Sequence, residues 1–148
     1  MKFHVRRATL ADGEGAIETL RRSIAELCIP DHGGDARKLE RWLANKTVEN
    51  WAKWIAQEDV IGLVAEREGR IIGVGMANLQ GEIRLNYVHP EARFAGVSSA
   101  LLAALEADLR ACNLWDCRLE STITARPFYE GRGYRGVRGN ATILAKSL

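Results

Sequence analysis

The stretch EIRLNYVHPEARFAGVSSALL, residues 82–102, decides the fold, because it passes from a strand through a short loop into a helix. Polar and apolar side chains alternate from Glu82 to Val88, which is typical of a strand. His89-Pro90 ends that strand. A helix is predicted over Val97–Ala111, since its large apolar residues recur at helical spacing: Leu101, Leu102, Leu105 and Leu109.

Such a junction between strand and helix suits a phosphate group. The first turn of a helix has free backbone N–H groups, and the helix dipole adds roughly half a positive charge there. Gly96 lets the backbone approach a ligand closely, Arg93 adds a cation with several donors, and the hydroxyls of Ser98 and Ser99 add further donors. A glycine and an arginine before a helix also occur in many folds that bind nothing, so the loop alone leaves binding open.

Two motifs resemble the signatures of the GNAT acetyltransferases. The loop Arg93-Phe94-Ala95-Gly96-Val97-Ser98 is similar to [QR]-x-x-G-x-[GA], which in that family grips the pyrophosphate of acetyl-CoA, although Ser98 stands where Gly or Ala is usual. The segment ARPFYEGRGY, residues 125–134, is similar to the second signature, A-x-x-F-Y-x-x-x-G-[FY]. Tyr87-Val88-His89-Pro90 also resembles the strand end that precedes the loop in the family.

The resemblance covers nearly the whole chain and implies one N-acetyltransferase domain over residues 1–148. It implies a mixed α/β fold, with a mostly antiparallel central sheet flanked by helices and two parallel strands splayed apart. Those strands would be Glu82–Val88 and Cys117–Ser121. The pantetheine arm of the coenzyme would pair with the backbone of Tyr87 and Val88.

Acetyl transfer to an amine requires a base for the ammonium proton, stabilisation of an oxyanion, and an acid for the departing thiolate. Glu82 is the candidate base, since the family's histone acetyltransferases have their catalytic glutamate at the same offset before the loop; a solvated carboxylate at a hairpin end is the alternative. Tyr129 of the second signature is the candidate acid, with a core residue as the alternative. The resemblance implies that the backbone N–H of Val88 donates a hydrogen bond to the oxyanion. Thr122 and Thr124 are candidate contacts to the pantetheine amides.

The rest of the chain reads as a mixed α/β pattern without repeats or linkers. We expect a capping box at Thr9–Asp12 before the first helix, and a loop at residues 31–34. Thr124 is expected to cap a short helix. The remaining expected elements are a strand over Phe3–Arg7, two short helices of which Thr47 caps the second, strands over Val60–Arg67 and Arg70–Leu79, and a final pair at Tyr134–Val137 and Ala141–Ala145.

Other residues leave alternatives open. His32 is a candidate for the acceptor site, with a solvated loop histidine as the alternative, and Cys28 near His32 leaves a catalytic cysteine open. Scattered histidines and an odd number of cysteines without CxxC spacing predict no metal site. A basic cluster could face coenzyme phosphates, an acidic acceptor or solvent: Arg126, Arg132, Arg135 and Arg138.

Composition narrows the class of protein. A net charge of +2 is too small to predict nucleic-acid binding, and no apolar run is long enough to span a membrane. The charged N-terminal segment lacks the apolar stretch of a signal peptide, so we expect a cytoplasmic protein. Edge strands and candidate exposed tryptophans favour a homodimer. The resemblance thus implies acetyl transfer to an unidentified small-molecule or peptide amine, with a non-catalytic CoA-binding module as the alternative.

Overall fold

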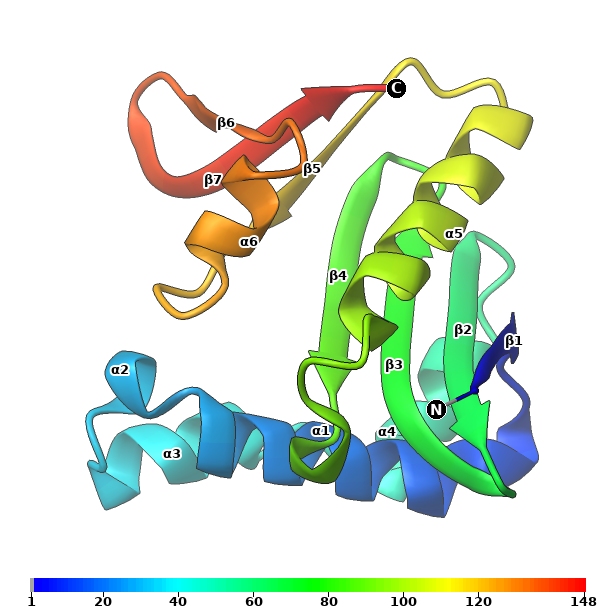
Figure 1. The fold of residues 1–148 in the computed structure, drawn as a ribbon, viewed down its shortest axis with the longest axis vertical. Helices are drawn as coiled ribbons and strands as arrows, with labels where there is room; N and C mark the ends of the chain where they lie inside the picture. The colour runs from blue at the N-terminus through cyan, green and yellow to red at the C-terminus, as the bar shows by residue number, and fades with distance from the viewer. Residues whose placement is uncertain (1) are drawn as a thin grey trace.

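The computed structural model describes residues 2–148, and over these residues seven strands form one mixed sheet in the order β1-β2-β3-β4-β5-β7-β6 (Figure 1). Neighbouring strands are antiparallel except β4 and β5, which are parallel. The sheet is therefore the mixed one that the resemblance implies. Its strands are β1 (His4–Arg7), β2 (Val60–Arg67), β3 (Arg70–Asn78), β4 (Glu82–Val88), β5 (Asp116–Glu120), β6 (Arg135–Val137) and β7 (Asn140–Ser147).

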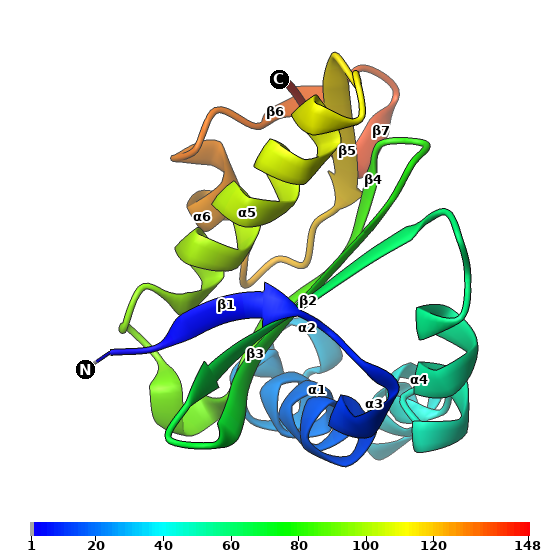
Figure 2. The ribbon, with the colours of Figure 1, turned by 90° about the vertical axis from the view of Figure 1, so that its right-hand side faces the viewer.

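Helices cover both faces of the sheet. Figure 2 shows α1, α3 and α4 on one side of the central strands and α5 on the other. Two 3-10 turns, Leu10–Asp12 and Pro90–Ala92, precede α1 and follow β4. The helices are α1 (Gly13–Leu27), α2 (Ile29–His32), α3 (Ala36–Leu43), α4 (Val48–Ile55), α5 (Val97–Ala111) and α6 (Arg126–Glu130).

The central strands are buried on both faces, which follows from the two helical layers. On β2, Leu63 and Ala65 belong to the apolar cluster that includes α5, whereas Val64 between them belongs to the cluster formed with α1 and Trp51. Successive strand residues point to opposite faces, so one strand contributes to both cores. The two cores fix β2 and β3 as the rigid centre of the molecule.

Gly73 of β3 allows α5 to lie close to the sheet. A Cβ atom at this position would be 2.5 Å from Val97 Cγ1 and 2.9 Å from Leu101 Cδ1. Heavy atoms do not approach so closely without displacement, so only glycine fits under the first turns of α5. Because these turns follow the loop of residues 93–96, the position of the loop depends on this contact.

Strands β4 and β5 are paired only where β4 begins. The partners are Glu82 with Arg118 and Ile83 with Leu119, and beyond them the two strands diverge (Figure 1). The sequence-based prediction of two splayed parallel strands is thereby confirmed. From Arg84 onward, β4 has no strand partner on its β5 side.

The sequence predicted most elements within one or two residues, including β4 and α5 with the observed bounds, and Thr47 caps α4 by accepting from Asn50 N at 3.2 Å. The expected loop over residues 31–34 is partly wrong, because Asp31 and His32 belong to α2. Proline in the first turn favours this helix, and Gly33, with φ of 63°, ends it.

The expected Thr124 cap of α6 is also wrong. Ala125 is the N-cap residue and no side chain caps the helix in the usual way. Instead, the hydroxyl of Thr122 accepts a hydrogen bond from Ala125 N at 3.0 Å. This bond closes the turn that leads into α6, and the hydroxyl of Thr124 takes no part in it.

We predict that Gly73→Ala lowers the free energy of unfolding by about 1–3 kcal/mol, since overpacking forces Val97 and Leu101 to move. Urea titration of the purified protein measures the change. Gly75→Ala is the matched control on the same strand, because its nearest contact would be Leu105 Cδ1 at 3.2 Å, and it should cost less. Equal stability of the two variants would contradict the packing argument.

Candidate active site

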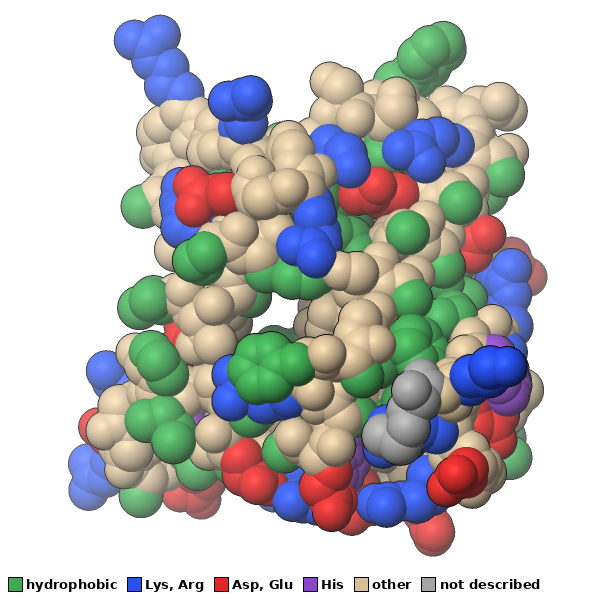
Figure 3. Space-filling view, viewed as in Figure 1, with side chains coloured by type: hydrophobic (Ala, Val, Ile, Leu, Met, Phe, Trp, Pro, Cys, Tyr) green, Lys and Arg blue, Asp and Glu red, His purple; other side chains and the backbone are tan. Residues whose placement is uncertain are grey.

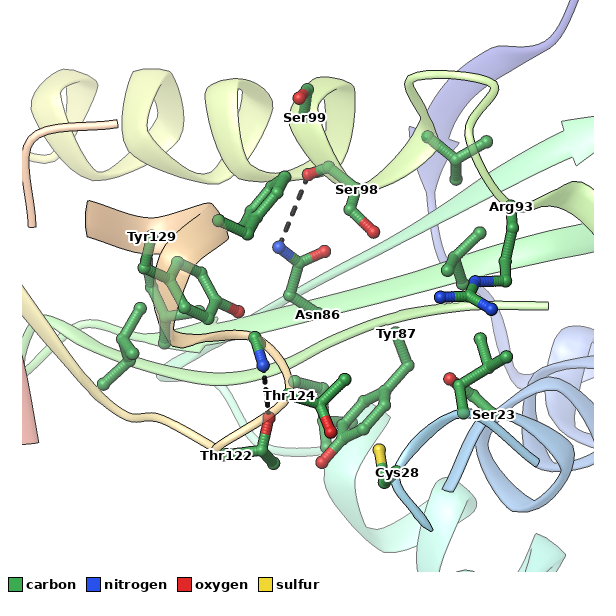
Figure 4. Close-up of a pocket in the computed structure, with 18 of the residues that line it drawn as sticks. Ser23, Cys28, Asn86, Tyr87, Arg93, Ser98, Ser99, Thr122, Thr124 and Tyr129 are labelled. Carbon is green, nitrogen blue, oxygen red and sulfur yellow. Dashed lines mark hydrogen bonds between the residues drawn. The ribbon is translucent and has the colours of Figure 1, made fainter. Parts of the chain in front are cut away.

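The divergence of β4 and β5 opens a cavity of about 550 Å³. Figure 3 shows a hollow at the centre of the face in view, and Figure 4 shows polar and apolar side chains converging on the cavity from several elements. The walls come from the end of α1, β4, the loop before α5, the end of β5, and α6. Eleven of the thirteen site residues predicted from the sequence line it: Tyr87, Val88, Arg93, Phe94, Gly96, Val97, Ser98, Ser99, Thr122, Thr124 and Tyr129.

The loop before α5 has the geometry of an anion site. Gly96 is the N-cap residue in the left-handed conformation, with φ of 82°, and no side chain caps the helix. A Cβ atom at Gly96 would meet nothing within 4 Å, so the space above the loop is open. The free N–H groups of the first turn and the positive end of the dipole therefore face an accessible cavity, which fits a pyrophosphate.

Two arginines line the same end of the cavity. Arg93 lies in the loop, with its guanidinium 4.7 Å from the ring centroid of the exposed Phe94. Arg132 reaches the helix from the segment after α6 and donates from Nε to Ser99 Oγ at 3.1 Å. In Figure 4 the hydroxyl of Ser98 points into the cavity, whereas Ser99 lies on the other side of the helix turn. Ser98 is thus the better placed of the two serine donors.

Tyr129 is buried in the core and also lines the cavity. Its ring packs edge-on against Phe128 and Tyr134, with centroids 5.2 and 5.5 Å away, and the residue is buried. It also lines the cavity, where its hydroxyl lies near Asn86 of β4 (Figure 4). Burial raises the pKa of the phenol to about 12, and a hydrogen bond with the Asn86 side chain partly opposes the shift. The phenol is therefore protonated at neutral pH and able to donate.

The two threonines line the cavity, but their hydroxyls already have partners. Besides the bond from Ala125 to Thr122, Thr124 Oγ1 donates to Asp31 Oδ2 at 2.6 Å, and Thr124 N donates to the same oxygen at 3.3 Å. This contact joins α2 to the segment after β5 across the mouth of the cavity.

Two predicted site residues are not among those that line the cavity, Ala95 and Glu82. The Glu82 side chain is 43% exposed at the start of β4, where Oε1 accepts from Asn78 Nδ2 at 3.3 Å and lies 3.5 Å from Arg118 Nη2. Asn78 lines a second cavity, of about 430 Å³. Glu82 itself lines neither cavity, and its carboxylate is held by Asn78 and by the ion pair with Arg118.

His32 and Cys28 take structural positions. His32 is 4% exposed, so the expectation of a solvated loop histidine is wrong; Nδ1 accepts from Gly34 N at 3.1 Å and Nε2 lies 3.3 Å from Ala25 O. It therefore fastens α2 to α1. Cys28 lines the cavity, but burial raises the pKa of its thiol to about 11, and a protonated thiol is a poor nucleophile.

Several lining residues carry no sequence signal. Ser23 and Leu27 come from the end of α1, and Asn86 looks like an ordinary outward residue of a strand. The Oδ1 atom of Asn86 is buried without a hydrogen-bond partner among the described residues, while its Nδ2 donates to Ser98 O at 3.4 Å. Arg132 belonged to the basic cluster noted in the sequence, and its side chain is directed to the loop by the fold.

Among residues 2–148, no three His, Cys, Asp or Glu side chains gather closely enough to bind a metal ion. Nor does any helix there have the length and apolar character needed to cross a membrane.

Comparison with known proteins places the chain in a family. The model of the acetyltransferase (GNAT) domain matches residues 28–143, and the chain therefore belongs to the GNAT acetyltransferase family. No curated protein sequence matches it.

The fold is shared with solved acetyltransferases. The PaiA N-acetyltransferase of Thermoplasma acidophilum, solved in complex with coenzyme A, is 20% identical with a TM-score of 0.87, and 100% of each chain is covered. A GCN5-related N-acetyltransferase of Rhodopseudomonas palustris is 22% identical with a TM-score of 0.86, covering 100% of this chain and 97% of that one. The ribosomal-protein-S18-alanine N-acetyltransferase of Escherichia coli is 16% identical with a TM-score of 0.73, covering 99% and 94%.

We predict that acetyl-CoA raises Tm and that Gly96→Glu abolishes the rise, because a side chain and a negative charge would enter the space above the loop. Gly69→Glu is the matched control, since Gly69 also has positive φ, 77°, and open space, but lies in the turn between β2 and β3. Arg93→Ala should weaken binding less severely than Gly96→Glu. Calorimetry with the folded variants measures affinity, and unchanged affinity of Gly96→Glu would place the coenzyme elsewhere.

Proposed function

We propose that this protein is an N-acetyltransferase that moves the acetyl group of acetyl-CoA to a primary amine by direct attack in a ternary complex. The observation that carries the proposal is one continuous cavity that runs from the uncapped N-terminus of α5, along the unpaired edge of β4, to the phenol of Tyr129. Acetyl-CoA would supply the activated thioester. The chain has to bind it, orient it and move two protons.

The binding residues divide by the part of the coenzyme that they would hold. The loop from Arg93 to Ser99 would hold the pyrophosphate through backbone N–H groups, with Arg93 and Arg132 adding charge. The edge of β4 at Tyr87 and Val88 has no strand partner on the β5 side, so its backbone groups are available to an extended pantetheine arm. The N–H of Val88 is our candidate for stabilising negative charge on the carbonyl oxygen.

Tyr129 is our candidate for the acid that protonates the departing thiolate. A pKa of about 12 keeps its proton in place at neutral pH, and its packing against Phe128 and Tyr134 fixes the direction of the hydroxyl. Glu82 is our candidate base, acting through water, since it lines neither cavity and only its hydrogen-bond partner Asn78 lines the second. A relayed proton would explain how a base outside the coenzyme cavity serves the reaction.

The solved neighbours support coenzyme binding and leave the acceptor open. One of them was solved with coenzyme A and another from Brucella melitensis with acetyl-CoA, while others are named for a ribosomal-protein alanine or an aminoglycoside. Both protein and small-molecule amines are therefore represented among them. The acceptor of this chain has to be sought in its own side chains.

We predict that Tyr129→Phe lowers kcat by about 100-fold and leaves the affinity for acetyl-CoA nearly unchanged, because it removes a proton donor and keeps the ring in the core. Steady-state release of free thiol gives kcat, and calorimetry gives the affinity. Tyr134→Phe is a contrasting variant, since Tyr134 Oη donates to Glu106 Oε2 at 2.7 Å and does not line the cavity; it should alter stability more than kcat. An unchanged kcat in Tyr129→Phe would leave this tyrosine a packing role alone.

We predict that Glu82→Gln lowers kcat/KM at neutral pH by roughly 10- to 1,000-fold, with partial recovery at high pH as the free amine becomes available. The pH–rate profiles of wild type and variant on one confirmed acceptor test this. Glu49→Gln, at an exposed carboxylate of α4, is the matched control and should follow wild type. If the Glu82→Gln profile superimposes on that of wild type, another group removes the proton.

A further inference from the structure

The second cavity is the strongest feature that the proposed reaction has not yet used. It lies on the side of β3 and β4 where α3 and α4 pack, and has a volume of about 430 Å³. Most of its lining side chains are polar, and its ionisable groups are two cations and one carboxylate, Lys46, Arg84 and Asp59. The remaining lining residues are Asn45, Trp54, Gln57, Val60, Met76, Asn78, Gln80 and Leu85.

Lys46 is a buried cation that lacks an anionic partner. The residue is 8% exposed, and its ammonium donates only to neutral oxygens, Asn45 Oδ1 at 2.6 Å and Trp42 O at 3.4 Å. Among the described residues no carboxylate lies within 4 Å of it. Its own backbone oxygen accepts from the guanidinium of Arg21 at 3.2 Å, which adds a second cation nearby.

Burying an ammonium without an opposite charge is costly, and desolvation lowers the pKa of Lys46 accordingly. Replacement by an apolar residue would relieve that cost if the position served packing alone. A cation held toward a polar cavity at such cost indicates that the cavity receives an anion.

Arg84 lies in a wall that this cavity shares with the coenzyme cavity. Arg84 and Leu85 line both, at the point where β4 loses its β5 partner. The Arg84 side chain is exposed and makes no hydrogen bond or ion pair within residues 2–148. Its planar guanidinium is thus free to take a carboxylate with two hydrogen bonds.

We propose that the second cavity binds the acceptor, and that the acceptor is a small amine that also carries a carboxylate, as amino acids do. This inference rests on the proposed acetyl transfer and names its substrate class. Lys46 and Arg84 bind the carboxylate, and the amine reaches the acetyl group where the two cavities meet. The cavity has two cations and only one carboxylate, Asp59. Its excess positive charge would repel a polyamine, which disfavours that class of acceptor.

Pairs of amines that differ only in the carboxylate test the inference. Suitable pairs are lysine with cadaverine and phenylalanine with phenethylamine, offered with acetyl-CoA in the thiol-release assay. We expect KM for the carboxylated member to be about 10- to 100-fold lower, as for charge-assisted hydrogen bonds. Calorimetry of the same pairs with the protein saturated by CoA should give the same order without requiring turnover.

Two variants link the preference to the cavity. Lys46→Met keeps the length of the side chain and removes the charge, so KM for the carboxylated amine should rise about tenfold or more while kcat and acetyl-CoA affinity stay unchanged. Lys53→Met, at an exposed lysine of α4, is the matched control and should change neither. Arg84→Gln should likewise raise KM for the carboxylated member and leave that of its decarboxylated partner unchanged.

The outcomes separate the two levels of inference. The carboxylate assignment would be overturned by equal or tighter binding of the decarboxylated amines, or by no binding of any carboxylated member to the CoA complex. In either case, binding of acetyl-CoA would leave the proposed enzyme class intact. An unchanged preference in both Lys46→Met and Arg84→Gln would also overturn it. Failure of acetyl-CoA to bind the wild-type protein would instead count against the proposed function.

Discussion

The separation of β4 from β5 after two paired residues is the constraint on which the site depends. If pairing continued beyond Ile83 and Leu119, the two strands would lie at hydrogen-bonding distance along their whole length, and the space between them that now forms the cavity would be closed. The unpaired edge of β4 would normally attract another strand, yet here α5 and the end of α1 enclose it. An edge that is both unsatisfied and enclosed is suited to an extended ligand with amide groups, because only a chain of that shape can complete the sheet.

Two polar contacts hold the halves of the sheet at this separation. On one side, the buried carboxylate of Glu106 on α5 accepts from Tyr134 Oη at 2.7 Å and from Lys146 Nζ at 2.9 Å, and so ties α5 to the C-terminal strands. On the other, Asp31 of α2 bonds with Thr124 across the mouth of the cavity. The first is buried and costly to break, whereas the second is exposed and weak. The contact at Asp31 is therefore the weaker of the two.

The sequence predicted those parts of the molecule that local rules determine. The bounds of β4 and α5 and the loop with Gly96 follow from periodicity and glycine placement, whereas the splayed strands were implied only by the resemblance of two motifs to the family signatures. Local rules did not give α2, because the glycines after it suggested a loop although Pro30 favours a helix start. The second cavity, the buried Lys46 and the reach of Arg132 to Ser99 also escaped prediction, since each arises from elements far apart in the chain. A buried lysine and an exposed one look alike in a sequence.

The same burial that shapes the cavity also decides which chemistry its side chains favour. Desolvation raises the pKa of Cys28 to about 11 and that of Tyr129 to about 12, so both are protonated at neutral pH and neither is an activated nucleophile. His32 and His89 are not among the lining residues, so the cavity's serines have no imidazole there to act as a base. A cavity with proton donors and without an activated nucleophile supports direct attack by the acceptor amine over an acyl-enzyme. The acceptor must then bind beside the thioester, and Arg84 and Leu85 are the residues that line both cavities.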